Sequence, residues 1–589
     1  MKNYLRKLFL FSLLTAACIF IEAANSEIFP SIEFEYNGLF YDVLSTDRAT
    51  VQVHIPSNRP DNWYQYFNGM VNIPETVEHE GTTYTVEAID HETFRGQFYL
   101  TGVVIPKTVK EIGYRAFKGV PTLKTVVFAS DGVLTTIERE AFESSSISSI
   151  TFPNALTYIG EDAFKYCESL KSIKGGESIE HIDNNVFQGC ISLTEYTCPK
   201  ALKKIGDLAF WNCTALRTVN MNEGLETIGN DAFLQCSVLE NVNMSSTIKT
   251  IGWEAFRWCL NLRHIEIPDS VKDMDYGTFR YCTGLESIKL SKSLRKIPGW
   301  CFEGTVLKSI EIPNSVTMIM PYAFQGVNTL ETVEWGNSLE SIGDNAFLGT
   351  SLKSLVLPEP LKEICGAAFA KCDSLTEVTI PATVIKIDDA AFQECSMLKD
   401  VYCLGVTPPD IPYTNCPFTF CDNPVNVHIY EGLRDLYESS IGWSVAIQKN
   451  YITLLDDMPA LKIESITIDN APYNCNIGEI GQATATILPT NAFSRELSWS
   501  SSDDTILYID EFSGMFVALS EGTVTITATA TDGSGVSATA TVYVGQNNAI
   551  IAPAIDRKVQ TTIYNLQGQK LLTPRKGIYI INGKKVIIK

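Results

Sequence analysis

Several ingredients of enzyme active sites are scarce or missing in this chain. Only six of the 589 residues are histidines, and no two of these have the spacing of metal ligands on a helix. The motifs HExxH, CxxC and GxSxG and the phosphate-binding loop are also absent. We therefore expect a protein that is not an enzyme and that needs no cofactor and no metal.

Positive charge is scarce too, because 46 Lys and Arg stand against 68 Asp and Glu, a net charge of −22. This excess of negative charge disfavours non-specific binding to nucleic acid or to anionic lipid. Beyond the N-terminal segment, no apolar run reaches the roughly 18–20 residues of a membrane helix. We expect no nucleic-acid partner and no membrane span.

Residues 1–24 have the pattern of a secretory signal peptide. A basic start, MKNYLRK, precedes the apolar run Leu8–Ile21, and Ala23-Ala24 offers a cleavage site. Cys18 loosely resembles a lipid-attachment site, but the apolar run continues past it and a Leu three residues earlier is missing. We expect a secreted protein on the outer cell surface, without a lipid anchor at Cys18.

What the sequence has in abundance is internal repetition. The pattern Leu-x-x-Ile-x-Ile-Pro-x-x-Val-x-x-Ile-Gly-x-x-Ala-Phe-x-x-Cys recurs about every 23 residues over 89–400, and Leu225–Cys236 is a clear copy of its second half. The Phe of the pattern occurs fourteen times, as Phe94, Phe117, Phe142, Phe164, Phe187, Phe210, Phe233, Phe256, Phe279, Phe302, Phe324, Phe347, Phe369 and Phe392. A fixed period in this range predicts a solenoid, in which each unit buries its apolar face by stacking on its neighbours.

Each repeat divides into three predicted pieces. Leu-x-x-Ile-x-Ile alternates like a strand and ends at Pro, which cannot donate to a ladder. Val-x-x-Ile predicts a second short extended piece, and Ala-Phe-x-x-Cys predicts a short helix or 3₁₀ turn. Fourteen copies of the first strand, about 4.8 Å apart, would form one continuous sheet on the order of 65 Å long.

Different patterns flank the repeats. Residues 25–88 contain a hairpin-like region and predict an N-terminal cap, and residues 401–459 predict a proline-rich C-terminal cap with a short amphipathic helix ending at Trp443. Seven short strands within 460–545 predict a β-sandwich of immunoglobulin size, and 546–589 is a small β-rich tail. The predicted fold class is therefore mainly β, a solenoid followed by a sandwich and a β tail.

Half of the sixteen cysteines follow the repeated Phe by three residues. These eight are Cys167, Cys190, Cys213, Cys236, Cys259, Cys282, Cys372 and Cys395. Stacking would place their thiols about 5 Å apart, which suits disulfides or a metal chain as well as a structural ladder of buried thiols. Because other repeats carry Gln97, Val120 or Ser145 at this offset, we favour buried thiols. Cys403, Cys416 and Cys421 in the cap are better disulfide candidates. The sequence leaves open whether Cys416 and Cys421 form a disulfide that closes a short loop or remain free thiols.

The positions that the pattern leaves free predict a binding face. In the first strand the aliphatic residues point inward, so the x positions of stacked strands form outward rows. One row is Asn220, Asn243, Glu266, Lys289, Glu311 and Glu334, and a parallel row is Thr218, Asn241, His264, Ser287, Ser309 and Thr332. These polar rows of mixed charge suit an extended protein or glycan, with an ordinary solvated surface as the alternative.

An aromatic pair in the repeats and an acidic pair in the predicted sandwich each allow a functional and a structural interpretation. Trp258 and Tyr281 occupy equivalent turn positions in adjacent repeats, where they could form an exposed aromatic patch, although stacking on the next turn is favoured. Asp503-Asp504 could bind calcium, but the dense Asp/Asn/Gly pattern of a calcium loop is absent and a solvated turn is favoured.

The motifs resemble known families. The AF-x-x-C and IP-x-x-V elements resemble the BspA-like leucine-rich repeats of bacterial surface proteins. Trp499-Ser500-Ser501-Ser502 and Glu521-Gly522-Thr523 resemble a bacterial Ig-like domain of group 2. Tyr564–Gly568 and Lys576–Ile580 resemble the C-terminal sorting segments of type IX secretion in Bacteroidetes. The first resemblance implies a cell-surface role in adhesion or host interaction. We expect a monomeric adhesin that binds protein of a host matrix or of other bacteria, with capture of a glycan or nutrient as the alternative.

Overall fold

The computed structural model describes residues 32–545, apart from 60, 460–461, 472, 489–491 and 493, together with the backbone of four strands in the tail. The predicted signal peptide and Cys18 lie outside the described residues. The chain divides into two compact units, Met1–Leu352 with Cys365–Cys372 as unit 1 and Lys353–Ile364 with Asp373–Lys589 as unit 2.

Unit 1 begins with the predicted cap. Strands β1 (Glu33–Tyr36) and β2 (Leu39–Ser45) form the expected antiparallel hairpin, whose turn places Asn37 and Gly38 at φ 52° and 77°. Strand β3 (Thr50–Val53) then pairs in parallel with β6 (Thr82–Ile89), which forms a hairpin with β5 (Thr76–His79). The cap thereby supplies the first members of the stack.

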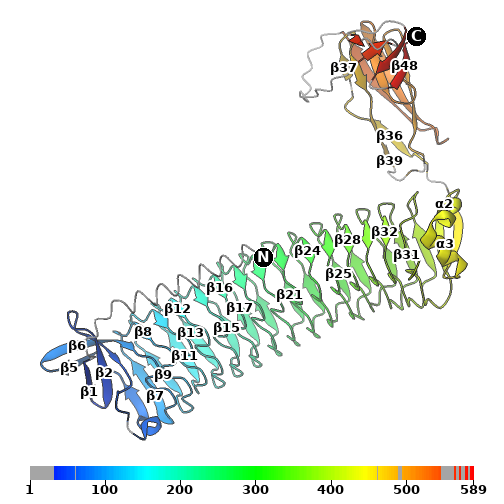
Figure 1. The fold of residues 1–589 in the computed structure, drawn as a ribbon. Helices are drawn as coiled ribbons and strands as arrows, with labels where there is room; N and C mark the ends of the chain where they lie inside the picture. The colour runs from blue at the N-terminus through cyan, green and yellow to red at the C-terminus, as the bar shows by residue number, and fades with distance from the viewer. Residues whose placement is uncertain are drawn as a thin grey trace. The chain divides into compact units, whose positions relative to one another are not determined.

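The short strands of unit 1 form the longest ladder. Sheet order continues from β6 through two-residue strands, each parallel to the next and lying along one edge of the coils (Figure 1). They are β8 (Glu111–Ile112), β10 (Thr136–Ile137), β12 (Tyr158–Ile159), β14 (His181–Ile182), β16 (Lys204–Ile205), β18 (Thr227–Ile228), β20 (Thr250–Ile251) and β22 (Asp273–Met274). Strands β24 (Lys296–Ile297), β26 (Met318–Ile319) and β28 (Ser341–Ile342) pair in the same way.

The longer strands were expected to form one continuous sheet, and this prediction is wrong. The structure divides them into the ladders β4-β7-β9, β11-β13, β15-β17-β19, β21-β23 and β25-β27. Two of the breaks fall where the repeat departs from 23 residues, with 24 from Val126 to Ile150 and 22 from Ile288 to Ile310. The other two breaks fall at the regular spacing of 23, from Ile173 to Tyr196 and from Val242 to Ile265, so repeat length alone does not decide where a ladder ends.

The bounds of these strands follow the predicted alternation. They are β4 (Asn68–Asn72), β7 (Tyr99–Ile105), β9 (Thr125–Phe128), β11 (Ser149–Phe152), β13 (Ser172–Gly175), β15 (Glu195–Thr197), β17 (Thr218–Asn220), β19 (Asn241–Asn243), β21 (His264–Glu266), β23 (Ser287–Lys289), β25 (Ser309–Glu311) and β27 (Thr332–Glu334). In β21, for example, Ile265 is buried between exposed His264 and Glu266.

The Ala-Phe-x-x-Cys segment forms turns rather than a helix. The backbone N–H of Leu234 donates to the Asp231 carbonyl, and that of Cys236 to the Phe233 carbonyl, each at 3.1 Å, which is the spacing of a 3₁₀ turn. Asp231, which opens the first turn (φ 53°), and Gln235, inside the second (φ 61°), have left-handed backbone, which prevents a continuous helix.

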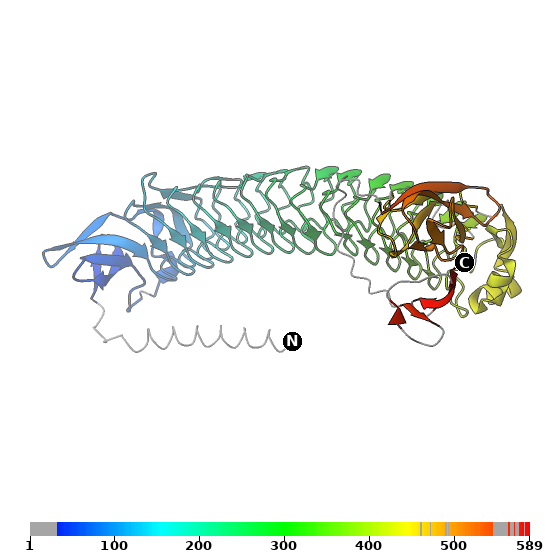
Figure 2. The ribbon, with the colours of Figure 1, turned by 90° about the horizontal axis from the view of Figure 1, so that it is seen from above.

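A column of phenylalanine rings runs through the interior of the coils. In unit 1, consecutive rings from Phe94 to Phe369 lie 4.9–6.1 Å apart between centroids, and every one of these side chains is buried. Phe67 of the cap extends the column, with its ring 4.9 Å from that of Phe94. The coils of unit 1 lie side by side (Figure 2), and the phenylalanine column connects each coil to the next.

Unit 2 opens with the remaining repeats and the C-terminal cap. Its strands here are β29 (Ser354–Val356), β30 (Glu363–Ile364), β31 (Glu377–Ile380), β32 (Lys386–Ile387), β33 (Asp400–Cys403), β34 (Val425–Tyr430) and β35 (Ile452–Met458). The cap has two helices, α2 (Arg434–Ser439) and α3 (Ile441–Gln448). The predicted helix end at Trp443 is therefore wrong, because Trp443 is a buried residue inside α3 whose indole donates to the Pro409 carbonyl at 2.8 Å.

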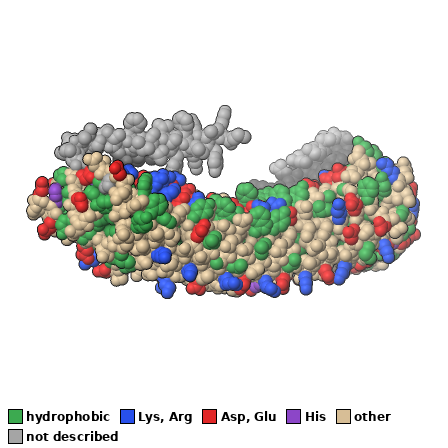
Figure 3. Space-filling view, turned by 90° about the horizontal axis from the view of Figure 1, so that it is seen from below, with side chains coloured by type: hydrophobic (Ala, Val, Ile, Leu, Met, Phe, Trp, Pro, Cys, Tyr) green, Lys and Arg blue, Asp and Glu red, His purple; other side chains and the backbone are tan. Residues whose placement is uncertain are grey.

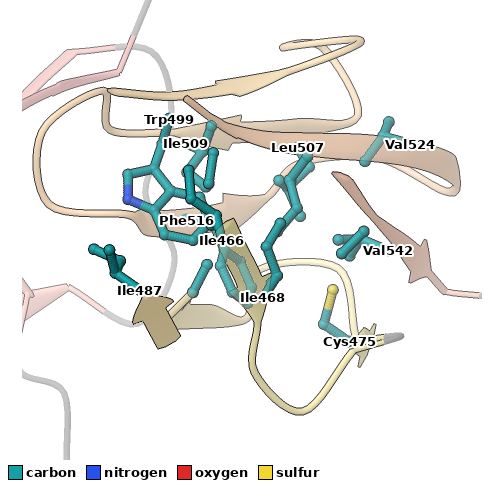
Figure 4. Close-up of a cluster of buried hydrophobic side chains, with 14 of the residues drawn as sticks. Ile466, Ile468, Cys475, Ile487, Trp499, Leu507, Ile509, Phe516, Val524 and Val542 are labelled. Atoms are coloured by element: carbon teal, nitrogen blue, oxygen red, sulfur yellow. The ribbon is translucent and has the colours of Figure 1, made fainter. Parts of the chain in front are cut away.

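The sandwich of unit 2 contains all seven predicted strands and two more. They are β36 (Ser465–Ile468), β37 (Tyr473–Cys475), β38 (Ile480–Gln482), β39 (Ala485–Leu488), β40 (Leu497–Ser501), β41 (Leu507–Ile509), β42 (Met515–Ala518), β43 (Gly522–Ala530) and β44 (Ser537–Val544). Figure 4 shows its core, where Trp499 and Phe516 lie among aliphatic side chains from the facing strands. The short strands β37 and β38 are the two that the sequence pattern did not predict.

The tail is β-rich as expected. Its described strands are β45 (Ile563–Asn565), β46 (Lys570–Leu571), β47 (Gly577–Ile581) and β48 (Lys584–Ile588), which form an antiparallel sheet in the order β46-β45-β47-β48.

Candidate functional site

The predicted rows lie on the outer side of the long strands of unit 1. Parallel register pairs Asn220 with Asn243, Glu266 with Lys289, and Glu311 with Glu334. The side chains of His264, Glu266 and Lys289 are 55%, 61% and 64% exposed. Stacking thus brings row members together in register within each of these ladders, on a surface open to solvent.

Side chains within the rows bind one another. The Asn243 amide donates to the Asn220 carbonyl oxygen at 2.7 Å, and a His264 ring nitrogen lies 2.9 Å from the Ser287 hydroxyl. Lys289 donates to Glu266 at 3.2 Å, and this bond holds the pKa of the Glu266 carboxyl below its usual range. These contacts order the side chains that a partner would meet.

The ladder break between β19 and β21 coincides with a hollow in this face. A groove of about 750 Å³ lies there, lined by Asn241, Asn243, His264 and Glu266 from the predicted rows and by Arg263 beside them. Its lining carries both charge signs, as does the surface seen in Figure 3, where acidic and basic side chains are interspersed. The groove is a concave, polar site on the long-strand surface, where a second hollow of about 470 Å³ lies between β9 and β11.

The like-charged pair Glu311 and Glu334 is a second notable feature of the rows. The two residues stand opposite each other in the parallel ladder of β25 and β27, and both are exposed. Adjacent like charges destabilise a sheet slightly, and a cation or a basic group placed between them would relieve the repulsion.

The predicted ladder cysteines are buried and point at the phenylalanine column. The thiol of Cys236 donates to the Phe210 carbonyl at 3.2 Å, and Cys167, Cys190, Cys213, Cys259, Cys282 and Cys372 each make the same bond to the Phe carbonyl of an earlier coil at 3.0–3.4 Å. Burial raises the pKa of Cys236 to about 12, so its thiol stays protonated and unreactive. The side chain therefore fills space and also satisfies a carbonyl.

Residues that replace Cys in other repeats support this interpretation. The Ser145 hydroxyl donates to the Phe117 carbonyl at 2.7 Å, which reproduces the thiol's bond with a different donor. The Gln97 amide donates instead to the Trp63 carbonyl and accepts from the Phe67 backbone, so it joins the first repeat to the N-terminal cap.

The cap cysteines do not form the disulfide that the sequence left open. Cys403, Cys416 and Cys421 are free thiols. Cys421 follows Phe418 by three residues and lies 3.6 Å from the Phe392 carbonyl, and the Phe418 ring stacks on that of Phe392 at 5.7 Å. Cys421 is thus a further member of the ladder, and the 26-residue spacing from Phe392 to Phe418 concealed it.

The aromatic pair Trp258 and Tyr281 and the acidic residue Asp503 both make the contacts of structural residues. The rings of Trp258 and Tyr281 stack at 6.2 Å with an interplanar angle of 18°, and the Arg257 guanidinium lies 4.0 Å from the Trp258 centroid. Asp503 accepts hydrogen bonds from the backbone and hydroxyl of Thr505, as expected of a turn. Among the residues that the structure describes, no group of three or more His, Cys, Asp or Glu is arranged to hold a metal ion.

Glu140 and His428 are two of the titratable groups held in ion pairs. Burial alone would raise the pKa of Glu140, but hydrogen bonds from Arg115 and Lys118 outweigh it and lower the pKa to about 2. Within unit 2, the His428 ring lies between the carboxylates of Asp457 at 2.9 Å and Asp400 at 3.1 Å. Their hydrogen bonds outweigh burial and raise the pKa of His428. Both groups link neighbouring strands or turns, which is a structural role.

Sequence reasoning missed one concave site. It lies beside the short strands and includes Trp253 and Tyr276, which follow β20 and β22 at the same repeat position. The available signal was two aromatic residues spaced 23 apart, at a position that the three preceding repeats fill with Asn184, Asp207 and Asn230.

The repeats match a known family model. The model described as "BspA type Leucine rich repeat region (6 copies)" matches residues 87–217, 203–331 and 317–444, which together span more than half of the chain. The chain belongs to the BspA-type leucine-rich repeat family. In this BspA-type protein, residues 462–542 also match the model of the bacterial Ig-like domain of group 2.

Solved structures with similar repeats come from several bacteria. A leucine-rich repeat protein of Bacteroides ovatus is 27% identical over 63% of this chain and 94% of its own, with a TM-score of 0.47. A leucine-rich cell surface protein of Faecalibacterium prausnitzii is 23% identical with the same coverages and a TM-score of 0.34. The pneumococcal vaccine antigen PcpA is 21% identical over 70% and 96%, with a TM-score of 0.37. No curated protein matches this chain.

In the described part of this BspA-type protein, no helix is long and apolar enough to cross a membrane.

Proposed function

We propose that this BspA-type protein is a secreted surface protein, without enzymatic activity, that binds an extracellular protein of a host matrix or another bacterium through the long-strand face of unit 1. The observation that carries the proposal is the groove of about 750 Å³ between β19 and β21, since it lies within the rows Asn220–Glu334 that the repeat leaves free. The signal-like residues 1–24 support secretion to the outer cell surface.

An extended chain suits this face better than a compact one. In-register rows repeat the same side-chain position once per coil, so a partner strand lying along them meets a similar environment at each step. Charges of both signs, Arg263 and Lys289 beside Glu266, favour recognition by complementary charge, which governs specificity and association rate more than total affinity. The tail resembling type IX sorting segments would serve export or anchoring, and the Ig-like domain would serve as a spacer.

The test is binding of the mature chain to an array of matrix proteins, followed by variants of the face. Glu266→Lys combined with Glu311→Lys should weaken binding about thirtyfold, since each reversal costs about 1 kcal/mol by replacing an attraction with a repulsion. Glu168→Lys with Glu180→Lys is the matched control, because both residues are exposed and lie outside the long strands. If the two double variants fold normally and bind with equal affinity, the binding site lies outside the long-strand face.

A further inference from the structure

The short-strand side of unit 1 has a hollow of about 550 Å³ that lies outside the proposed long-strand face. The residues that shape it are Asn230, Trp253, Asp275, Tyr276, Arg280 and Trp300. They come from four successive coils, so the hollow exists only because the coils stack.

Aromatic side chains dominate this hollow. Trp253 is 52% exposed and Tyr276 is 36% exposed, although large aromatic groups on a solvent surface lose the free energy of burial. The Trp300 ring lies 5.8 Å from that of Tyr276 and stacks on Tyr322 at 5.1 Å with an interplanar angle of 3°. The partly exposed rings of Trp253 and Tyr276 therefore line the hollow together with Trp300, whose ring is held in place by stacking on Tyr322.

Missing side chains make room for these rings. A Cβ atom added to Gly299 would lie 2.8 Å from the Tyr276 ring, closer than such atoms approach. Gly277 has left-handed backbone with φ 64°, and a Cβ there would lie 2.9 Å from the Glu254 side chain. A larger residue at Gly299 would displace the Tyr276 ring.

The charges beneath the hollow already have partners. Glu254, whose side chain is 9% exposed, pairs with Arg257 at 2.6 Å and with Arg280 at 3.6 Å. Arg280 also donates to Glu303 at 2.6 Å. Because these carboxylates and guanidinium groups pair with one another, they leave little net charge to attract an ion. The aromatic faces of the hollow therefore lie above a layer of paired charges.

Polar groups with fixed orientation border the rings. The Asn230 side-chain oxygen accepts from the Trp253 backbone at 2.9 Å, and the Asp275 carboxylate accepts from the Tyr276 backbone at 2.7 Å. Both residues also line a second hollow of about 410 Å³, where Thr227, Thr250 and Asp273 of the short strands stand. The two hollows thus adjoin each other at Asn230 and Asp275.

We propose that this site binds a neutral oligosaccharide, with one sugar ring against Trp253 and Tyr276 and its neighbours extending over the short strands. The C–H groups on one face of a pyranose pack against the negative face of an aromatic ring, while its hydroxyls both donate and accept hydrogen bonds. Asn230, Asp275, Thr227 and Thr250 supply matching donors and acceptors. An anionic ligand would meet Asp273 and Asp275, and Arg280 is already paired with Glu254 and Glu303 and so offers it no free positive charge.

The experiment is affinity electrophoresis of the mature chain in gels that contain starch, xylan, galactan or laminarin, followed by titration calorimetry with oligosaccharides of any polymer that retards it. Trp253→Ala with Tyr276→Ala should weaken binding by at least about tenfold, because two stacking contacts are lost. Tyr276→Phe, which keeps the ring, should bind within about threefold of the natural protein. Tyr166→Ala, an exposed tyrosine outside the hollow, is the matched control and should bind normally.

The outcomes separate this site from the long-strand face. Glu266→Lys with Glu311→Lys should retain oligosaccharide binding, and the aromatic double variant should retain protein binding. Should the double variant fail to fold, Asp275→Ala at an exposed position serves instead and should weaken oligosaccharide binding at least about threefold. Absence of retardation by all four polymers, or retention of binding by the Trp253→Ala, Tyr276→Ala double variant, overturns the proposal, as does aromatic-dependent binding of polylysine alone.

Discussion

The solenoid and the sandwich of this chain bury aromatic side chains in opposite ways. Inside the coils, Phe233 lies between Phe210 and Phe256, each 5.3 Å away, so every ring of the column meets copies of itself. In the sandwich, Trp499 lies against side chains of different types from strands distant in sequence (Figure 4). The first arrangement couples each coil to its two neighbours, whereas the second couples all strands to one core.

The largest expected effect tests this difference directly. Phe233→Ala and Trp499→Ala should each lower the free energy of unfolding of their own region by about 3–5 kcal/mol, because both remove a buried aromatic group. Hydrogen exchange should rise in the coils on either side of Phe233, with distant coils unchanged, and throughout the sandwich for Trp499→Ala. Hydrogen-exchange mass spectrometry of the full chain measures both patterns.

Phe512→Ala is the control, because that ring is 81% exposed and its loss should leave exchange unchanged. A Phe233→Ala protein whose neighbouring coils exchange as before would show that the column does not couple the repeats.

A smaller effect concerns charge, which differs between turns of the solenoid. The folded pKa of Glu140 lies near 2, below the value of 4.5 expected for an unfolded chain, so its ion pairs stabilise the protein fully above pH 4.5 and are lost as pH falls toward 2. Glu140→Gln should lower the free energy of unfolding by about 2 kcal/mol at pH 7. Denaturant titrations at pH 7 and pH 2.5 measure this, and the difference from the natural protein should shrink at the lower pH.

Glu226→Gln is the matched control, since Glu226 pairs with Lys249 at 2.9 Å on an exposed surface and should change stability little. An equal loss of stability in the Glu140→Gln and Glu226→Gln proteins would contradict the stabilising role assigned to the ion pairs of Glu140.

The smallest expected effect concerns the thiol ladder. Cys236→Ala should lower the free energy of unfolding by about 1 kcal/mol, since it leaves a small cavity and removes one donor from the Phe210 carbonyl. Cys236→Ser should lose less, because Ser145 makes the equivalent hydrogen bond in its own coil. Chemical denaturation of both variants provides the comparison.

Thiol titration of the denatured, unreduced protein completes this test. It should recover at least the eight ladder cysteines, and recovery of almost none would show that they form disulfides.

Much of the solenoid was predictable because its contacts join equivalent positions. Once Phe233 recurs at a fixed period, its neighbours Phe210 and Phe256 follow without knowledge of the coil path. The same logic correctly placed the outward rows of Asn220 and His264. It failed for the long-strand ladders, which end at regular as well as irregular repeat spacings, and where three extra residues hid Cys421 from the pattern.

The sequence by itself thus determined the stack, its interior column and its polar rows, since periodicity alone dictates which residues repeat on which side. Only the tertiary structure decided that the short strands carry the longest ladder, because register depends on backbone geometry. It also brought Trp253, Tyr276 and Trp300 from separate coils around one hollow. Trp253 and Tyr276 share one repeat position and Trp300 occupies the next, and the distances among them depend on how the coils turn and on the space left at Gly277 and Gly299.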